Sequence, residues 1–481
     1  MRQLSQDEVD RQAEFVKQIV AHVGPLLLNP ASDLHRELSR LGAFLQACET
    51  KLIKLMNNEH PSENEPGVTQ YGLVLYCVDK DHPILRRLLG FPKTQVTPAM
   101  LQQWEKQIVT GGGVDDYEGS LIELGKYEQL DPAWVTALIY YVALKTGLSV
   151  VSSLAPFGKT PATVAAPSDL KIALVGDWGT GNWTDGVIAC PALAVIDQVR
   201  RVSPDYTIHL GDVYYAGTAG FGSDEELANF VNLWAGGSQG SFMLNSNHEM
   251  YSGAQGYFGQ GLRAAPFAIQ NGASYFALQS DQWIIIGLDT AYYDPSPLFM
   301  NGALIDNDQI SFIRGLTTAN KKVIVLTHHN GTNIEGTAPL SLWTDVTSAL
   351  GKPPDFWYWG HIHNAIVYSG ESYPAQQGVK ARCVGHGAIP FGVGYGLMDQ
   401  NGANKPSIEY FAHELLSSAY PNTDARQANR VLNGFALLTL SADSITEEFI
   451  DQTGVVRWKL ETPFGDQPGF EGLSGGAEGG G

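Results

Sequence analysis

Two short apolar segments that each end in histidine constrain the fold more strongly than any other feature of the sequence. Val323–Leu326 leads into His328, and Phe356–Trp359 leads into His361 and His363. Each segment has the length and the residue types of a buried β-strand. In an open α/β sheet the loops at the carboxyl ends of such strands converge on one crevice, where ligands bind. The histidines therefore predict a metal site at that edge of a sheet.

Three earlier segments end in the same way, so we expect more ligands at this edge. They are Lys171–Val175, Tyr206–Leu210 and Ser241–Leu244, all short and mostly apolar. The residues that follow them are Asp177; Asp212 and Tyr215; and Asn247, His248 and Glu249. A single Asp, Asn or His after a strand is usually a turn or structural residue. Five strand ends of this kind in one chain favour a ligand cluster instead.

The candidate ligands fall into two sets by their chemistry. Asp177 and Tyr215 are hard oxygen donors that, with His363, suit a trivalent ion such as Fe³⁺. A phenol is a poor ligand for Mg²⁺ or Zn²⁺, because its pKa of about 10 must be overcome. Asp212 can bridge two ions. The neutral donors, which suit a divalent ion, are Asn247, His328 and His361.

In order along the chain, the motifs are Gly-Asp-Trp-Gly, Gly-Asp-x-x-Tyr, Asn-His-Glu, Val-x-x-His and Gly-His-x-His. This set resembles the five motifs of the calcineurin-like metallophosphoesterases, over about residues 170–460. Tyr215 after Asp212, and Gly179 two residues after Asp177, are similar to the purple acid phosphatase branch. The resemblance implies an α/β fold, in which a sandwich of two mixed sheets is flanked by helices and carries a dinuclear site along one edge.

The resemblance also implies roles for these residues. His248 would protonate the leaving alkoxide as general acid, and Glu249 would orient His248. A hydroxide held by two ions about 3.5–4 Å apart would attack a phosphate ester in line, without a phosphoenzyme. The implied ligands are Asp177, Asp212, Tyr215 and His363 for Fe³⁺, and Asp212, Asn247, His328 and His361 for Fe²⁺, Zn²⁺ or Mn²⁺.

This sequence departs from the family pattern at two motifs. Ser246 stands where a glycine usually precedes Asn-His, which changes the turn but removes no ligand. His329 directly follows His328, but Val325, three residues before His328, favours His328 as the ligand. Few basic residues lie near the motifs, so the expected substrate is a small phosphorylated molecule of modest charge. The candidates for additional substrate contacts, all in loops, are Arg263, His329 and His386.

The first third of the chain predicts an all-α domain. Ser5 and Glu8 form a capping-box pattern. Apolar residues from Leu34 to Leu55 recur at alternating steps of four and three, which is typical of a helix with one apolar seam. We interpret the seam as core packing rather than a dimeric coiled coil, because it is short. The resemblance assigns this domain no function.

From Leu170 onward, strands alternate with helical and Gly-rich segments, as in a layered α/β domain. Asp306–Leu316 is predicted to be a crossover helix. Three antiparallel strands are predicted near the end, at Gly434–Leu440, Ile445–Ile450 and Val455–Leu460. The predicted division is a helical domain at 1–152, a Pro-containing linker at 153–169, a metallophosphoesterase domain at 170–470 and a disordered Gly-rich tail at 471–481.

Charge and cysteine content exclude several classes of protein. The 481 residues include 30 basic and 50 acidic ones and carry a net charge of −20. This balance argues against a nucleic-acid scaffold and against docking on an anionic membrane. The four cysteines are far apart and form no CxxC pair, so a disulfide framework or a cysteine zinc site is not expected. The first residues show no signal peptide, which favours a cytoplasmic protein; a secreted protein with its leader removed is the alternative.

Three functions are compatible with the motifs. The first is a purple acid phosphatase-like phosphomonoesterase. The second is a phosphodiesterase that acts on cyclic nucleotides or phospholipid headgroups with the same site. The third is a non-catalytic, partner-binding protein on the same fold. The presence of a complete ligand set together with His248 argues against the third.

Overall fold

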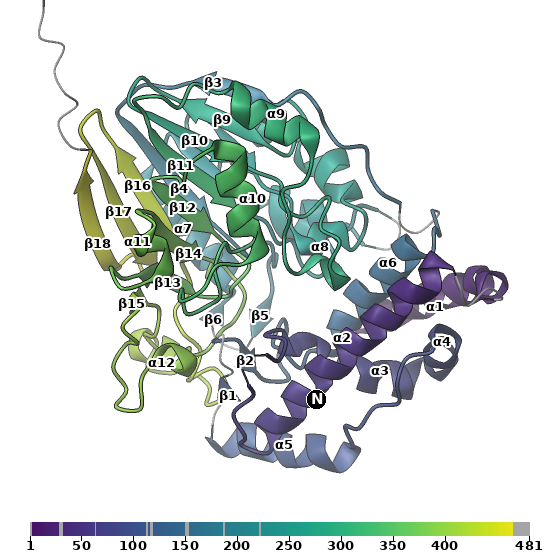
Figure 1. Ribbon diagram of the computed structural model, residues 1–481. Coiled ribbons are helices and arrows are strands. Elements are labelled where there is room, and N and C mark those ends of the chain that lie inside the picture. The colour runs from purple at the N-terminus through teal and green to yellow at the C-terminus, as the bar shows by residue number, and fades with distance from the viewer. Residues whose placement is uncertain are drawn as a thin grey trace, which may run out of the picture.

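The computed structural model describes residues 2–27, 32–62, 64–111, 114–115, 119–149, 153–185, 188–220 and 223–464. The Gly-rich tail predicted at 471–481 lies outside these ranges. Two layers of strands occupy one side of the molecule and the N-terminal helices occupy the other (Figure 1). No helix in the described part of the chain is both long and apolar enough to cross a membrane.

The two β-sheets are mixed and differ in size. The eight-stranded sheet has the order β15 (Ile408–Phe411), β13 (Ala365–Tyr368), β14 (Lys380–Val384), β12 (Phe356–Trp359), β11 (Lys322–Thr327), β10 (Trp283–Gly287), β9 (Phe276–Gln279), β3 (Ala162–Ala165). The six-stranded sheet has the order β18 (Val456–Pro463), β17 (Ser444–Asp451), β16 (Gly434–Leu440), β4 (Leu170–Val175), β7 (Tyr206–His209), β8 (Gly240–Met243). The three antiparallel strands predicted near the end are confirmed as β16, β17 and β18.

The sheets pack face to face around an apolar core. Phe242 of β8 and Phe276 of β9 stack across the two sheets with ring centroids 4.2 Å apart. Ile172, Ile208 and Ile285 are fully buried in the same cluster. Burial on both faces explains why these strands read as continuous apolar runs in the sequence. The predicted fold, a sandwich of two mixed sheets, is therefore confirmed.

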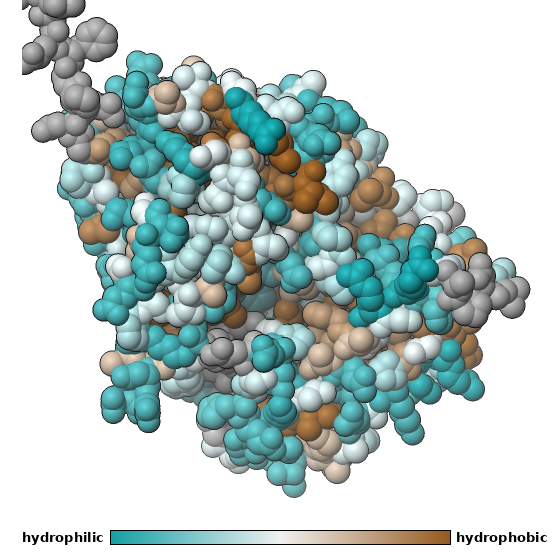
Figure 2. Space-filling view, in the orientation of Figure 1, coloured by the Kyte–Doolittle hydropathy of each residue, from teal (hydrophilic) through white to brown (hydrophobic). Residues whose placement is uncertain are grey.

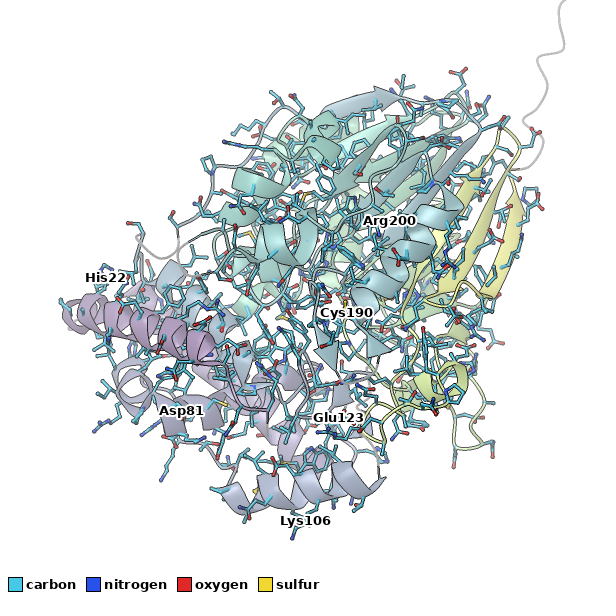
Figure 3. The ribbon with its side chains drawn as sticks, turned by 180° about the vertical axis from the view of Figure 1, so that it is seen from behind. His22, Asp81, Lys106, Glu123, Cys190 and Arg200 are labelled. Atoms are coloured by element: carbon cyan, nitrogen blue, oxygen red, sulfur yellow. The ribbon has the colours of Figure 1, made fainter. Side chains whose placement is uncertain are left out.

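Helices cover the outer faces of the sandwich. α9 (Asn307–Gly315) is capped by Asp306 and confirms the predicted crossover helix. α7 (Pro191–Val202) begins with proline and buries Val195 and Val199. Figure 3 shows Cys190 and Arg200 toward the two ends of α7. The remaining elements of this part are α8 (Asn247–Met250), α10 (Ser341–Leu350), α11 (Tyr373–Gln376), α12 (Leu416–Ala419), β5 (Thr184–Asp185) and β6 (Ile188–Ala189).

The N-terminal region is helical, as predicted, and also contains one pair of two-residue strands. Ser5 and Glu8 form the predicted capping box at the start of α1. His22, Asp81 and Lys106 mark the spread of this region in Figure 3. Its elements are α1 (Gln6–Leu26), α2 (Asp33–Met56), α3 (Val74–Asp81), α4 (Pro83–Leu89), α5 (Pro98–Gly111), β1 (Val114–Asp115), β2 (Leu121–Ile122) and α6 (Val135–Lys145). The apolar seam of α2 is buried inside the chain at Leu38, Leu41, Leu45, Cys48, Leu52 and Leu55.

The N-terminal helices and the sheets share one hydrophobic core, which the sequence did not predict. Tyr141 of α6 packs on Phe299, with ring centroids 5.6 Å apart, and both belong to a cluster that spans the two regions. The segment predicted as a linker, 153–169, contains β3, which pairs in parallel with β9. This segment is therefore part of the sandwich, and the predicted boundary at residue 170 divides a continuous structure.

Candidate metal centre

The carboxyl ends of five strands meet at one edge of the sandwich and carry the predicted ligands. β4, β7 and β8 are parallel neighbours in one sheet, and β11 and β12 are parallel neighbours in the other. Asp177, Asp212 and His361 follow their strands with left-handed backbones, at φ values of 55°, 74° and 67°. Such conformations are uncommon for residues with a side chain and gather at functional sites.

Two glycines allow these strand ends to approach one another. A Cβ atom on Gly211 would lie 2.7 Å from His328 Nδ1, and one on Gly360 would lie 2.6 Å from Asp177 Oδ2. A Cβ atom cannot approach another non-bonded heavy atom this closely without a shift of the structure. Glycine before Asp212 and before His361 is therefore a steric requirement of the site.

His328 lies at the centre of a first group of ligand atoms. Its Nε2 is 2.9 Å from Asn247 Oδ1, 3.2 Å from Asp212 Oδ1 and 3.2 Å from His361 Nδ1. Its Nδ1 donates to the Leu210 carbonyl oxygen at 2.8 Å. Burial lowers the pKa of His328 to about 3. The ring is therefore neutral, with the proton on Nδ1 and a lone pair on Nε2.

This first group needs a positive charge at its centre. Nε2 of His328, Oδ1 of Asn247 and Oδ1 of Asp212 are all acceptors, and buried acceptors that face one another without a donor are costly. His361 can supply at most one proton to them. A cation between these atoms would satisfy all of them. The ligand atoms of Asp177, Asp212 and His328 also lie within 4.8 Å of one another. The residues present thus fit a metal ion.

Tyr214 lies at the centre of a second group. Its hydroxyl is 3.0 Å from Asp212 Oδ2, 3.5 Å from Asp177 Oδ1 and 3.3 Å from His363 Nε2. Asp177 Oδ1 and His363 Nε2 are 3.6 Å apart. Asp212 directs Oδ1 to the first group and Oδ2 to the second, the placement expected for a bridging carboxylate.

The pKa values of the two buried carboxyl groups, Asp177 and Asp212, are shifted in opposite directions. Burial and the nearby Asp212 raise the pKa of Asp177 well above its usual value. Burial also disfavours the charged form of Asp212, but His248, His328 and His361 hold the pKa of Asp212 well below its usual value. Bound cations would stabilise both carboxylates in their charged forms.

The site coincides with a match to a known protein family. Residues 170–365, which include every predicted ligand, match the calcineurin-like phosphoesterases. These residues are a calcineurin-like phosphoesterase domain. This match supports two metal ions and metal-dependent hydrolysis of phosphoesters. The family predicted from the five motifs is confirmed.

Several solved structures are similar to the phosphoesterase domain, all at low identity. GAP50, the anchor in the inner membrane complex of Plasmodium, is 13% identical over 63% of this chain and 90% of that one, with a TM-score of 0.41. A dimetal phosphatase from Danio rerio is 11% identical over 62% of this chain and 100% of that one, with a TM-score of 0.38. PhoD is 12% identical over 66% of this chain and 75% of that one, with a TM-score of 0.37. No curated protein matches the chain.

The prediction that Tyr215 faces the cluster is wrong. Its hydroxyl hydrogen-bonds to Asp131, and its ring stacks on Tyr127 with centroids 4.7 Å apart. Trp134 packs against the edge of the same ring, with centroids 5.0 Å apart. All three partners belong to the N-terminal region, which turns Tyr215 away from the ligands. Tyr214, one residue earlier, presents its hydroxyl to the cluster instead.

His248 lies beside the ligands as predicted, but Glu249 does not orient it. His248 Nδ1 donates to the Tyr215 carbonyl oxygen at 2.7 Å, and Nε2 lies 3.9 Å from Asp212 Oδ2. The Glu249 carboxyl hydrogen-bonds to Ser246, whose hydroxyl is 2.5 Å from Asp212 Oδ1. Burial and Asp212 raise the pKa of Glu249 to about 8. Glu249 thus contacts Asp212 through Ser246 and makes no contact that orients the His248 ring.

Of the three predicted substrate contacts, only His329 lies beside the ligands, with its ring centroid 4.9 Å from that of His328 and 4.8 Å from that of His361. Both ring nitrogens of His329 are occupied, by Thr290 Oγ1 and by the Phe299 carbonyl oxygen, each at 2.8 Å. The His386 ring stacks on Phe449, with centroids 6.0 Å apart. Arg263 is exposed. None of the three is among the described residues that line the cavity beside the cluster.

That cavity has a volume of about 200 Å³ and adjoins both groups of ligands. This face of the molecule is hollowed near its centre, between the sheets and the N-terminal helices (Figure 2). Residues from both parts of the chain form the walls. Those from the two ligand groups are Asp212, Asn247, His361 and His363, and His248 lines the cavity beside them.

No sequence pattern indicated the residues that hold the ligands from the N-terminal side. Tyr71 donates to the Tyr251 hydroxyl at 2.6 Å, and Asn247 Nδ2 donates to the same oxygen at 2.7 Å. These contacts fix the Asn247 amide with Oδ1 toward His328. Tyr71 is 180 residues from Tyr251 in the chain, so only a folded structure could reveal the pair.

Replacing Tyr71 with Phe should weaken divalent-metal binding roughly tenfold, because the hydrogen bonds through Tyr251 that orient Asn247 affect metal affinity on this scale. Titration of the metal-free protein against a competing chelator measures the change. Tyr76→Phe, at a buried tyrosine of α3, is the matched control and should bind like the wild type. Equal affinity in Tyr71→Phe and the wild type would show that Asn247 is oriented by other contacts.

Proposed function

We propose that the protein is a purple acid phosphatase-like phosphomonoesterase. Membership of the phosphoesterase family supports metal-dependent phosphoester hydrolysis. The observation that carries the finer proposal is the position of Tyr214, whose hydroxyl lies within 3.5 Å of Asp177, Asp212 and His363. A phenol among two carboxylates and an imidazole is a hard donor set that suits Fe³⁺.

The proposed ligand sets follow the sequence prediction with one replacement, Tyr214 for Tyr215. Two bound ions would neutralise the charge of the phosphoryl group and make a water molecule nucleophilic near neutral pH. The proposed ligands of Fe³⁺ are Asp177, Asp212, Tyr214 and His363, and those of Fe²⁺, Zn²⁺ or Mn²⁺ are Asp212, Asn247, His328 and His361.

In this proposal His248 gives a proton to the leaving group. Its Nδ1 is fixed on the Tyr215 carbonyl oxygen, so the exchangeable site is Nε2. The residue also lines the cavity next to Asp212. As the P–O bond of the ester breaks, Nε2 would give its proton to the departing oxygen, and water would later restore that proton.

The size of the cavity favours monoesters over the diesters of the alternative hypothesis. A diester places a second organic group on the same phosphorus atom, and this group must also fit near the ligands. The space beside them is about 200 Å³, below the range of about 300–1,000 Å³ that is usual for ligand pockets. We therefore expect 4-nitrophenyl phosphate to be hydrolysed with a higher kcat/KM than bis(4-nitrophenyl) phosphate; the reverse order would favour a diesterase.

His248→Ala should lower kcat for an alkyl phosphate by about 10²–10⁴-fold, the usual contribution of a general acid. The loss should be much smaller for 4-nitrophenyl phosphate, whose leaving group needs little protonation. Metal content, measured by elemental analysis, should stay at the wild-type level. His35→Ala, at an exposed histidine of α2, is the control. An equal loss with both substrates would contradict the general-acid role, and full activity in His248→Ala would indicate a different mechanism.

The oxidised, iron-loaded protein should be violet or pink, from charge transfer between a phenolate and Fe³⁺. Tyr214→Phe should abolish this absorption band, whereas Tyr215→Phe should keep it, because the Tyr215 hydroxyl is bound to Asp131. A visible absorption spectrum of each variant at equal iron content measures the difference. Loss of colour in Tyr215→Phe alone would refute the Tyr214 assignment, and a colourless wild type that holds only zinc or manganese would refute the iron centre.

A further inference from the structure

The wall of the cavity opposite the ligands belongs to the N-terminal helical region. Phe44 lies on α2, and Val68 and Gln70 lie on the segment between α2 and α3. Loops of the phosphoesterase domain close the remaining sides, with Met300 and Leu340 among their lining residues. A substrate whose phosphoryl group lies at the ligands would therefore place its leaving group against the N-terminal region.

This wall is held in a fixed position by buried contacts. Tyr71, next to Gln70, hydrogen-bonds to Tyr251 at 2.6 Å. The Phe44 ring packs against the Tyr71 ring, with centroids 6.3 Å apart. Tyr71 and Tyr251 are fully buried. The shape of the wall is thus part of the folded core, and it can discriminate between leaving groups by fit.

The wall offers apolar surface and neutral hydrogen-bonding groups. Phe44, Val68 and Leu340 are apolar, and the Gln70 side chain supplies an amide. No lysine or arginine is among the described residues that line this cavity. Among the described residues, positive charge near a bound substrate would come only from the metal ions and from the protonated His248, both of which act at the phosphoryl group and its leaving oxygen. An anionic leaving group would lose its hydration here without gaining a lysine or arginine partner among these described residues.

A second cavity, of about 240 Å³, adjoins the first and shares Gly67, Asn330, Ile334 and Leu340 with it. It contains Lys51, whose ammonium donates to the Gly67 carbonyl oxygen at 2.7 Å. Two carboxylates, Glu65 and Glu335, line the same space. Glu65 pairs with Lys54 and Glu335 pairs with Lys405, so the charge preference rests on the first cavity.

We propose that Phe44, Val68 and Gln70 form a leaving-group wall that selects phosphate monoesters with compact, uncharged leaving groups. The inference rests on the proposed phosphomonoesterase function and gives the N-terminal region a role in specificity. Apolar contact with Phe44 and Val68 favours a leaving group with an apolar face. The absence of a lysine or arginine among the described lining residues disfavours a second phosphate or a carboxylate on the substrate.

The charge preference can be tested with two substrates of the same shape, 4-carbamoylphenyl phosphate and 4-carboxyphenyl phosphate. The wild type should have the higher kcat/KM for the neutral ester. Val68 is partly exposed, so Val68→Lys can place a cation in the cavity, and it should shift the ratio toward the anionic ester on the order of tenfold. Val68→Glu should shift the ratio the other way. Gln46→Lys, which adds the same charge at an exposed position of α2, should change nothing.

The size preference can be tested with Phe44→Ala, since Phe44 is also only partly buried. This change should raise kcat/KM for 2-naphthyl phosphate relative to phenyl phosphate, on the order of tenfold. Metal content and thermal stability of each variant are compared with the wild type. The increase should be absent in Gln46→Ala.

The possible failures are distinguishable. If the metal-loaded wild type hydrolyses no phosphate monoester, the proposed function and the leaving-group wall both fall. If it hydrolyses the neutral and anionic esters equally well, the selectivity falls and the phosphomonoesterase stands. The wild type can also discriminate between the esters while Val68→Lys, Val68→Glu and Phe44→Ala all leave the kcat/KM ratios unchanged. In that case other residues select the leaving group, and the inference is overturned.

Discussion

Several buried hydrogen-bond acceptors lie close together around His328 Nε2, and the rest of this structure depends on that constraint. Nε2 faces Asn247 Oδ1 at 2.9 Å and Asp212 Oδ1 at 3.2 Å, without a proton of its own to give. Such an arrangement is unfavourable unless a cation occupies it. Left-handed backbones at Asp177, Asp212 and His361, together with glycines at the strand ends, hold the ligand atoms at these distances. The stability of the two packed sheets must offset the cost of that local geometry.

Much of this site could be predicted because it lies at strand ends, and buried strands are visible in a sequence. The apolar runs before Asp177, Asp212, Asn247, His328 and His361 gave the strands, and parallel strands place their carboxyl ends together. The two-sheet fold followed from the family resemblance. The ligand positions required no information on distant contacts, which is why their placement agrees with the prediction.

The wrong predictions share one physical cause, contacts between residues far apart in the chain. Spacing alone favoured Tyr215 as the phenol, but Asp131, 84 residues earlier, binds its hydroxyl. Glu249 was expected to orient His248, yet a backbone carbonyl performs that task. His329 looked available for substrate, but Thr290 and Phe299 occupy both ring nitrogens. Each outcome depends on how the N-terminal helices or the loops pack against the edge of the sheets.

The central claim is that this edge holds two cations, with Asp212 between them. The most direct test is anomalous X-ray diffraction from crystals of the metal-loaded protein, compared with crystals of Asp212→Asn. We predict two anomalous peaks in the wild type, one beside Asn247, His328 and His361 and the other beside Asp177, Tyr214 and His363, and loss of at least one peak in the variant. Metal peaks away from these residues, or none at full metal loading, would contradict the account.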